Sequence, residues 1–202
     1  MFESYREFIG RYLQMSFLEW KIMETRLGVK HFGAGETILA QGDVCRQLYF
    51  MQSGLARAFV IDESGKDYTW SIFFNDEKAD MTNLFATDYD SFLHQKSSSL
   101  HIEAIEDTTL ITLAYEDMQL VYGKLKKAER FGRLMAEAAY SHLHAQSVSR
   151  LTKSAKERFE EFALRTPHLL EKVPQYHIAT FLGITPQHLS RLKKEHKINI
   201  CE

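Results

Sequence analysis

Residues 175–194 have the sequence QYHIATFLGITPQHLSRLKK. Gly183 separates two pairs of apolar residues at helical spacing, Ile178 with Leu182 and Leu189 with Leu192. Because glycine has no Cβ, Gly183 can take the left-handed conformation that commonly ends a helix. The stretch therefore predicts two short helices that meet at Gly183.

The residues around the glycine indicate how the second helix begins. Thr185 is a typical N-cap, and Pro186 suits the first helical position, where its missing N–H leaves no bond unmade. The small side chain of Ala179 would let the helices cross closely. This arrangement predicts a helix-turn-helix, whose second helix enters the major groove of DNA. An ordinary helical hairpin packed in a core would also fit the pattern.

Polar residues of the second helix are the candidate DNA contacts. Gln187 could pair with adenine and Arg191 with the O6/N7 edge of guanine. Ser190, Lys193 and Lys194 suit phosphate contacts, which position the protein without reading sequence. The full set of candidates is Gln187, His188, Ser190, Arg191, Lys193 and Lys194. Each could instead be an ordinary solvated surface residue.

Charge and composition are compatible with this function. Residues 150–202 hold ten Lys and Arg against six Asp and Glu, a net charge of +4, whereas the rest of the chain carries −6. A basic end on an acidic body is what DNA binding requires. The 202 residues suit one large or two small domains.

The sequence also predicts a cytoplasmic protein without a membrane span or a cofactor. Residues 1–6 are amphipathic, and no apolar run approaches the roughly 18 residues of a spanning helix. The two cysteines, Cys45 and Cys201, lie far apart without partners at metal-binding spacing. This usage indicates a reducing compartment and argues against an iron–sulfur cluster.

Upstream of residue 150 the pattern changes twice, so the predicted fold class is α+β. Residues 4–27 have helical spacing and a capping box at residues 16–19. Residues 29–113 have a β pattern that predicts a small barrel or jelly roll, with residues 62–66 as a hairpin loop. The strand candidates are Leu48–Met51, Leu55–Ile61, Tyr68–Phe74 and Leu110–Leu113.

A long helix is predicted from about Glu116 to Leu151. Its apolar and small residues keep three- and four-residue steps at Leu125, Ala128, Phe131, Met135, Ala138, Leu143, Ala145 and Val148. Such length suits a dimer-forming helix, although a helix packed along its own barrel would also fit. Three domains are expected: residues 1–118 with N-terminal helices and a sensor roll, 119–151 as dimerisation helix, and 152–202 as helix-turn-helix.

The order of roll, long helix and helix-turn-helix resembles the Crp/Fnr family of bacterial transcription regulators over nearly the whole chain. Gly35-Glu36, Gly42-Asp43 and the sequence LYFMQSG at residues 48–54 resemble the opening of the family's β-roll. Residues 128–137, AERFGRLMAE, resemble its dimerisation helix. Residues 173–191 resemble its helix-turn-helix, close to the form associated with Bacteroidetes members.

The resemblance implies a homodimer with two recognition helices one DNA turn apart on a near-palindromic site. The expected partners are double-stranded DNA, a second copy of the chain, RNA polymerase and an unidentified small-molecule effector of the roll. No membrane partner is expected.

The effector pocket departs from that of cyclic-AMP-binding relatives, which hold the nucleotide with a Gly-Glu-Leu run and an Arg-Ser pair. Ungapped counting places Asp80, Met81 and Thr82 at the first motif and Ser98 and Ser99 at the second. Met81 cannot accept a ribose hydroxyl, Ser98 cannot neutralise a phosphate, and Asp80 would repel it. We therefore expect a degenerate pocket that binds another ligand or none.

The C-terminus departs as well. Family members follow the recognition helix with a β-hairpin wing, and residues 195–202 are too few for a full wing. Pro186 stands where a cyclic-AMP-binding relative carries a DNA-reading arginine, so the target sequence of that relative does not transfer.

Two other functions fit parts of the pattern. The roll could be a small-molecule or protein-binding module whose helical tail serves assembly. A cupin-like enzyme would need a His/Glu metal cluster, and the roll offers only His31, His94 and His101, with no His-x-His pair. No catalytic residue and no metal ligand are predicted.

Overall fold

The computed structural model describes the backbone of residues 1–200 and the side chains of residues 1–195. The chain forms two compact units. The first consists of Met1–Ala58 and Ile72–Ser141, and the second of Phe59–Ser71 and His142–Glu202. Within the described part of the chain, every helix is too short or too polar to span a bilayer.

Two helices begin the first unit, α1 (Glu3–Gly10) and α2 (Phe17–Glu24). The predicted capping box is confirmed, because Ser16 Oγ accepts from the Glu19 amide at 3.3 Å and Glu19 Oε2 accepts from the Ser16 amide at 2.7 Å. The predicted extension of the helix to residue 27 is wrong. Leu27 begins a strand instead, because it pairs with Leu113 in the last strand of the roll.

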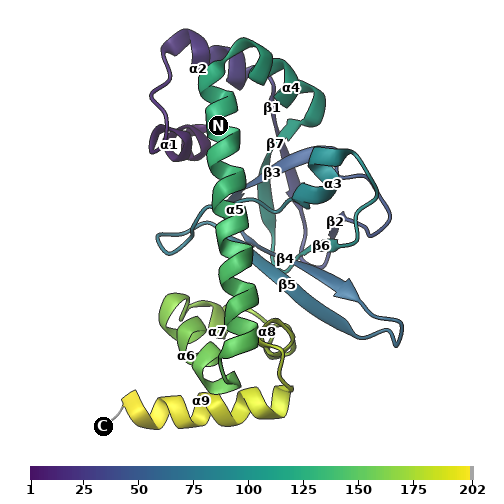
Figure 1. The fold of residues 1–202 in the computed structure, drawn as a ribbon, viewed down its shortest axis with the longest axis vertical. Helices are drawn as coiled ribbons and strands as arrows, with labels where there is room; N and C mark the ends of the chain where they lie inside the picture. The colour runs from purple at the N-terminus through teal and green to yellow at the C-terminus, as the bar shows by residue number, and fades with distance from the viewer. Residues whose placement is uncertain (201–202) are drawn as a thin grey trace. The chain divides into compact units, whose positions relative to one another are not determined.

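Seven strands make the roll, and they form two sheets. The three-stranded sheet has the order β1-β7-β3 and the four-stranded sheet the order β2-β6-β4-β5 (Figure 1). Their bounds are β1 (Leu27–Phe32), β2 (Thr37–Leu39), β3 (Gln47–Ser53), β4 (Leu55–Ile61), β5 (Asp67–Phe74), β6 (His101–Ala104) and β7 (Thr108–Ala114). All four predicted strand runs fall inside these strands, so the α+β class with a β-roll is confirmed.

The loop between β4 and β5 is the predicted hairpin. The Asp62 amide donates to Lys66 O and the Gly65 amide donates to Asp62 O, both at 2.9 Å. Gly65 has a φ of +82°, which glycine adopts without strain. The Asp62 carboxylate accepts from the Ser64 hydroxyl and from the Lys66 and Ser64 amides, and these bonds lower its pKa.

An aromatic cluster joins the helices of the first unit to the roll. The Phe8 ring of α1 lies 5.4 Å from Phe50 of β3, 5.6 Å from Phe85 and 5.9 Å from Phe131 of the long helix. Phe50 and Phe85 are almost completely buried. Edge and tilted contacts at these distances suit the aromatic quadrupole, so the cluster stabilises the unit beyond its apolar burial.

The predicted helix from Glu116 to Leu151 is two helices, α4 (Tyr115–Lys124) and α5 (Lys126–Thr152). Leu125 separates them in an extended conformation, with φ −128° and ψ 96°. Its side chain belongs to the buried core of the first unit. The break between α4 and α5 thus coincides with burial of the Leu125 side chain. Helical spacing in the sequence does not predict this break. A short helix, α3 (Tyr89–His94), was also not predicted.

The first and second parts of α5 differ in burial. Ala128, Phe131 and Met135 are buried in the core of the first unit, so this part packs along its own roll. Farther along, Tyr140 is 72% exposed and Leu151 86% exposed. Leu143 and Val148 are also exposed, and the four residues span one broad face of the helix. That face is exposed.

The second unit contains α6 (Ala155–Arg165), α7 (Leu169–Lys172), α8 (Gln175–Leu182) and α9 (Pro186–Ile200). Helix α6 packs against both α8 and α9. The buried apolar side chains of these helices are Phe159, Phe162, Leu169, Ile178, Leu182, Leu189 and Leu192. They give the second unit a hydrophobic core of its own.

Replacing Ser154 with alanine is expected to lower the free energy of unfolding by about 1 kcal/mol. Ser154 Oγ accepts from the Glu157 amide and Glu157 Oε2 accepts from the Ser154 amide, a capping box at the start of α6. Urea unfolding followed by circular dichroism measures the change. Glu157→Gln is the control, because glutamine can still accept the Ser154 amide. A Ser154→Ala protein as stable as wild type would show that the box contributes nothing.

Candidate nucleic-acid interface

Helix α8 ends at Gly183 as the sequence predicts. Gly183 has a φ of +67° and ψ of 35°, the left-handed conformation. The Ile184 amide donates to Ala179 O at 2.9 Å and the Gly183 amide donates to Thr180 O at 3.1 Å. These bonds satisfy carbonyls that the helix end would otherwise leave unpaired.

Helix α9 begins as predicted. Thr185 Oγ1 accepts from the His188 amide at 3.2 Å, which makes Thr185 the N-cap, and Pro186 is the first helical residue. Leu189 is completely buried and Leu192 nearly so, on the side of α9 that packs against the rest of the unit. The turn therefore fixes which face of α9 remains outside.

Four of the six predicted DNA-contact residues share that outer face. Gln187, Ser190, Arg191 and Lys194 are exposed and lie at steps of three, one and three residues, so one side of the helix carries them all. His188 is half-buried near the N-terminus of α9. The face offers an amide, a hydroxyl and two cations, which are the groups that contact base edges and phosphates.

Lys193 lies elsewhere. Its side chain is half-buried, and Nζ donates to Leu170 O of α7 at 3.1 Å. The ammonium therefore helps to hold α7 against α9 in this structure. Its predicted phosphate contact would require this bond to break.

Arg158 of α6 binds the C-terminal end of α8, next to the turn that precedes α9. The sequence did not indicate this role. Arg158 Nε and one terminal nitrogen donate to Leu182 O at 3.2 and 3.0 Å, and its other terminal nitrogen donates to Lys153 O at 2.6 Å. Arg158 thus satisfies carbonyls at the ends of α8 and α5. No local pattern marks it, because its partners lie up to 24 residues away.

The predicted effector residues of the roll are engaged in local structure. Asp80 Oδ1 accepts from the Thr82 amide at 2.8 Å and from the Asn83 amide at 3.3 Å, so the carboxylate closes its own turn. Met81 is half-buried and packs against the core. This run presents a carboxylate and a thioether, neither of which attracts a phosphate.

Ser98 is also a structural residue. It is 3% exposed, and its Oγ lies 2.7 Å from Asp88 Oδ2 and 2.9 Å from Leu100 O. Ser99 is exposed. The structure therefore holds Ser98 in a hydrogen-bonded turn beside a carboxylate.

The roll does contain a buried cation, Arg57 of β4, which the sequence did not single out. Its Nε donates to Glu103 of β6 at 2.6 Å, and the arginine is 3% exposed. Because a carboxylate neutralises it, Arg57 is not a free anion-binding group. Among residues with described side chains, no group of three or more His, Cys, Asp or Glu could hold a metal ion.

Comparison with known proteins identifies the class of the roll. Residues 29–124 match the family described as "Cyclic nucleotide-binding domain". No curated protein sequence matches the chain.

Solved structures resemble the chain over most of its length. FixK2 from Bradyrhizobium japonicum superposes with a TM-score of 0.74 at 16% identity, over 86% of this chain and 85% of that one. A protein from Eubacterium rectale assigned to the Crp/Fnr family of transcriptional regulators has a TM-score of 0.65 at 17% identity, over 92% and 85%. The catabolite activator protein of Thermus thermophilus gives 0.51 at 20% identity, over 93% and 86%. At these identities the similarity is one of fold.

Proposed function

We propose that the protein is a DNA-binding transcription regulator of the Crp/Fnr type and not an enzyme. The observation that carries the proposal is the outer face of α9, where Gln187, Ser190, Arg191 and Lys194 are exposed while Leu189 and Leu192 are buried. Helices α8 and α9 then act as a helix-turn-helix, with α9 in the major groove. The names of structurally similar proteins support this function.

The active form is a homodimer joined through the second part of α5. Tyr140, Leu143, Val148 and Leu151 expose apolar surface on one broad face of that helix. Pairing two such faces would remove this surface from water. A two-fold symmetric dimer presents two copies of α9, so the DNA site is near-palindromic.

The roll acts as a sensor for a ligand other than a cyclic nucleotide, or as a scaffold. Asp80 and Ser98 are committed to turns, and Arg57 is neutralised by Glu103. A cyclic phosphate would therefore meet no uncompensated cation at these positions. Residues 173–191 would be a helix-turn-helix of the Bacteroidetes form, and the regulator would act in the cytoplasm through RNA polymerase.

An unbiased selection of duplex DNA sites with the purified full chain tests the function. We expect a near-palindromic sequence whose half-sites lie about one helical turn apart, and an affinity that falls steeply with salt because Lys and Arg displace counterions. Repeating the selection with cell extract shows whether an effector changes the affinity. A chain that forms dimers but has no salt-dependent affinity for any duplex would instead support a ligand-binding or protein-binding roll with an assembly tail.

A further inference from the structure

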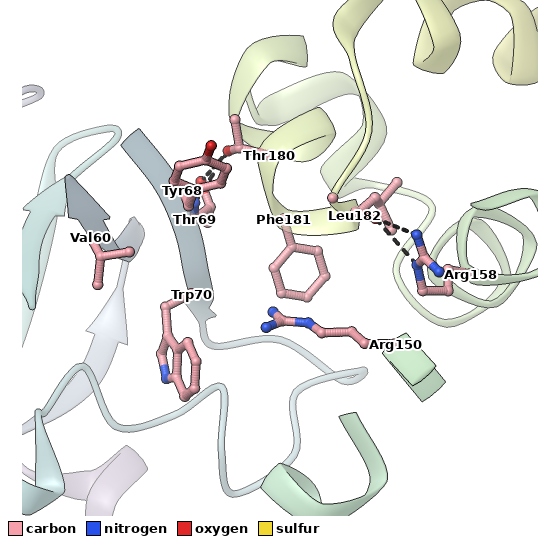
Figure 2. A pocket seen from close by; sticks show the side chains of 10 residues that line it. Val60, Tyr68, Thr69, Trp70, Arg150, Arg158, Thr180, Phe181 and Leu182 are labelled. Atoms are coloured by element: carbon pink, nitrogen blue, oxygen red, sulfur yellow. Dashed lines mark hydrogen bonds between the residues drawn. The ribbon is translucent and has the colours of Figure 1, made fainter. Parts of the chain in front are cut away.

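The second unit contains a cavity of about 410 Å³ that shares no residue with the outer face of α9 (Figure 2). The β4–β5 hairpin forms one wall with Tyr68 and Trp70. The ends of α5 and α8 and the start of α6 form the others, with Arg150, Phe181 and Arg158. All these segments belong to the second unit. The volume lies in the range of small-molecule sites.

A buried hydrogen bond holds the hairpin wall in place. The hydroxyl oxygens of Thr69 and Thr180 lie 2.9 Å apart, and the Thr69 amide donates to Thr180 Oγ1 at 3.2 Å. Thr69 is 2% exposed and Thr180 7% exposed. Because both residues are almost fully enclosed, the bond fixes β5 against α8 and so positions the aromatic side chains on either side.

The cavity has two cations and no matching carboxylate. The Arg150 guanidinium lies 5.6 Å from the Trp70 ring centroid, and Figure 2 shows it directed toward that ring. Arg158 binds only backbone carbonyls, which leave its charge in place. Among the residues with described side chains, no Asp or Glu pairs with either arginine. The two cations repel each other. Partial burial and this repulsion from Arg158 both lower the pKa of Arg150.

The aromatic side chains of the hairpin wall are partly exposed. Trp70 is 39% exposed and Tyr68 37% exposed, and the two flank the buried Thr69 on β5. Apolar and aromatic surface beside a few fixed polar groups is typical of a ligand site. The cavity thus combines flat apolar surfaces with positive charge.

We propose that this cavity binds a small organic anion with a planar aromatic part and one carboxylate or phosphate group. The planar part would lie against Trp70 and Phe181. The anionic group would accept hydrogen bonds from Arg150 and from the unused N–H groups of Arg158, and it would remove the repulsion between the two cations. This site does not depend on DNA binding by α9.

The two tryptophans of the chain give a direct test. Trp70 lines the cavity, whereas Trp20 is buried in the core of the first unit. The full chain labelled with 5-fluorotryptophan should give two ¹⁹F signals, assigned with Trp20→Phe. Benzoate and phenyl phosphate are the probes, and their relative affinities distinguish a carboxylate from a phosphate ligand. Two half-ligands are the controls. Benzyl alcohol has the aromatic ring without an anionic group, and inorganic phosphate has the anionic group without a ring.

We expect benzoate or phenyl phosphate to shift the Trp70 signal saturably and to leave Trp20 unchanged. Each half-ligand should bind at least about tenfold more weakly. Benzyl alcohol loses the charge-assisted hydrogen bonds and inorganic phosphate loses the burial of the ring, and each loss corresponds to roughly that factor. Arg150→Gln should weaken the better probe by about tenfold or more. Lys156→Gln, which removes an exposed cation of α6 outside the cavity, should leave the affinity unchanged.

Three results would overturn the proposal. The first is no saturable shift of Trp70 with either probe up to about 10 mM, a concentration that detects millimolar binding. The second is equal binding of a half-ligand. The third is equal weakening by Arg150→Gln and Lys156→Gln, which would indicate a general charge effect. An unchanged Trp20 signal confirms in each variant that the first unit remains folded.

Discussion

Replacing Arg191 with alanine is expected to weaken binding to the selected DNA site by about 1–3 kcal/mol, or roughly 5-fold to 150-fold, and to relax one base position. Arg191 is exposed on the outer face of α9, one residue after Ser190 and three before Lys194. From this position a guanidinium can donate two parallel bonds to the O6 and N7 atoms of guanine. Fluorescence anisotropy with a library of single-base variants of the site measures both effects.

Two further variants separate base reading from charge. Arg165→Ala removes an exposed arginine at the end of α6, and we expect little change in affinity and none in base preference. Lys194→Ala should weaken all sequences equally and reduce the salt dependence by about one counterion. If Arg191→Ala also weakens all sequences equally, Arg191 contacts phosphate and the base-reading assignment is wrong.

Replacing Gly54 with alanine is expected to lower the free energy of unfolding by about 2–6 kcal/mol, the combined cost of backbone strain and overpacking. Gly54 links β3 to β4 with a φ of +97°. An added Cβ would lie 2.6 Å from both Asp107 O and Thr108 Cα. These are backbone atoms, and Thr108 Oγ1 also hydrogen-bonds to the Leu55 amide and carbonyl, so the neighbour has little freedom to move.

Gly65→Ala is the matched control for Gly54→Ala. Gly65 has a φ of +82°, but no atom lies within 4 Å of its added Cβ. The control therefore measures the cost of the left-handed conformation alone, about 1–3 kcal/mol. Urea unfolding of both variants gives the steric part as the difference. Equal losses in the two proteins would mean that the contact at Thr108 relaxes without cost.

Features with local causes could be predicted from the sequence. The end of α8 at Gly183 and the cap at Thr185 each depend on residues within about five positions, and the structure confirms both. The hairpin at residues 62–66 and the capping box at Ser16 are of the same kind. In each case one residue type at one position satisfies a backbone group nearby.

Features with distant causes could not be predicted. The break at Leu125 accompanies burial in a core built from the whole first unit. Lys193 has helical spacing with the outer face of α9, yet its ammonium binds a carbonyl 23 residues away. Trp70 is one of many aromatic residues in the β pattern. It becomes part of a cavity wall because the neighbouring Thr69 is hydrogen-bonded to Thr180, 111 residues away. Helical and strand periodicity carry no information about such partners.

The pairing of β1 with β7 has a consequence for how the chain folds during synthesis. Leu27 pairs with Leu113, and β7 also lies between β1 and β3 in the sheet. The sheet therefore cannot close until the ribosome has released the chain beyond Ala114, and until then the apolar faces of β1 and β3 lack their common partner. Because such non-local pairing is slow, the unfinished roll is the stage at which the nascent chain is most exposed to aggregation.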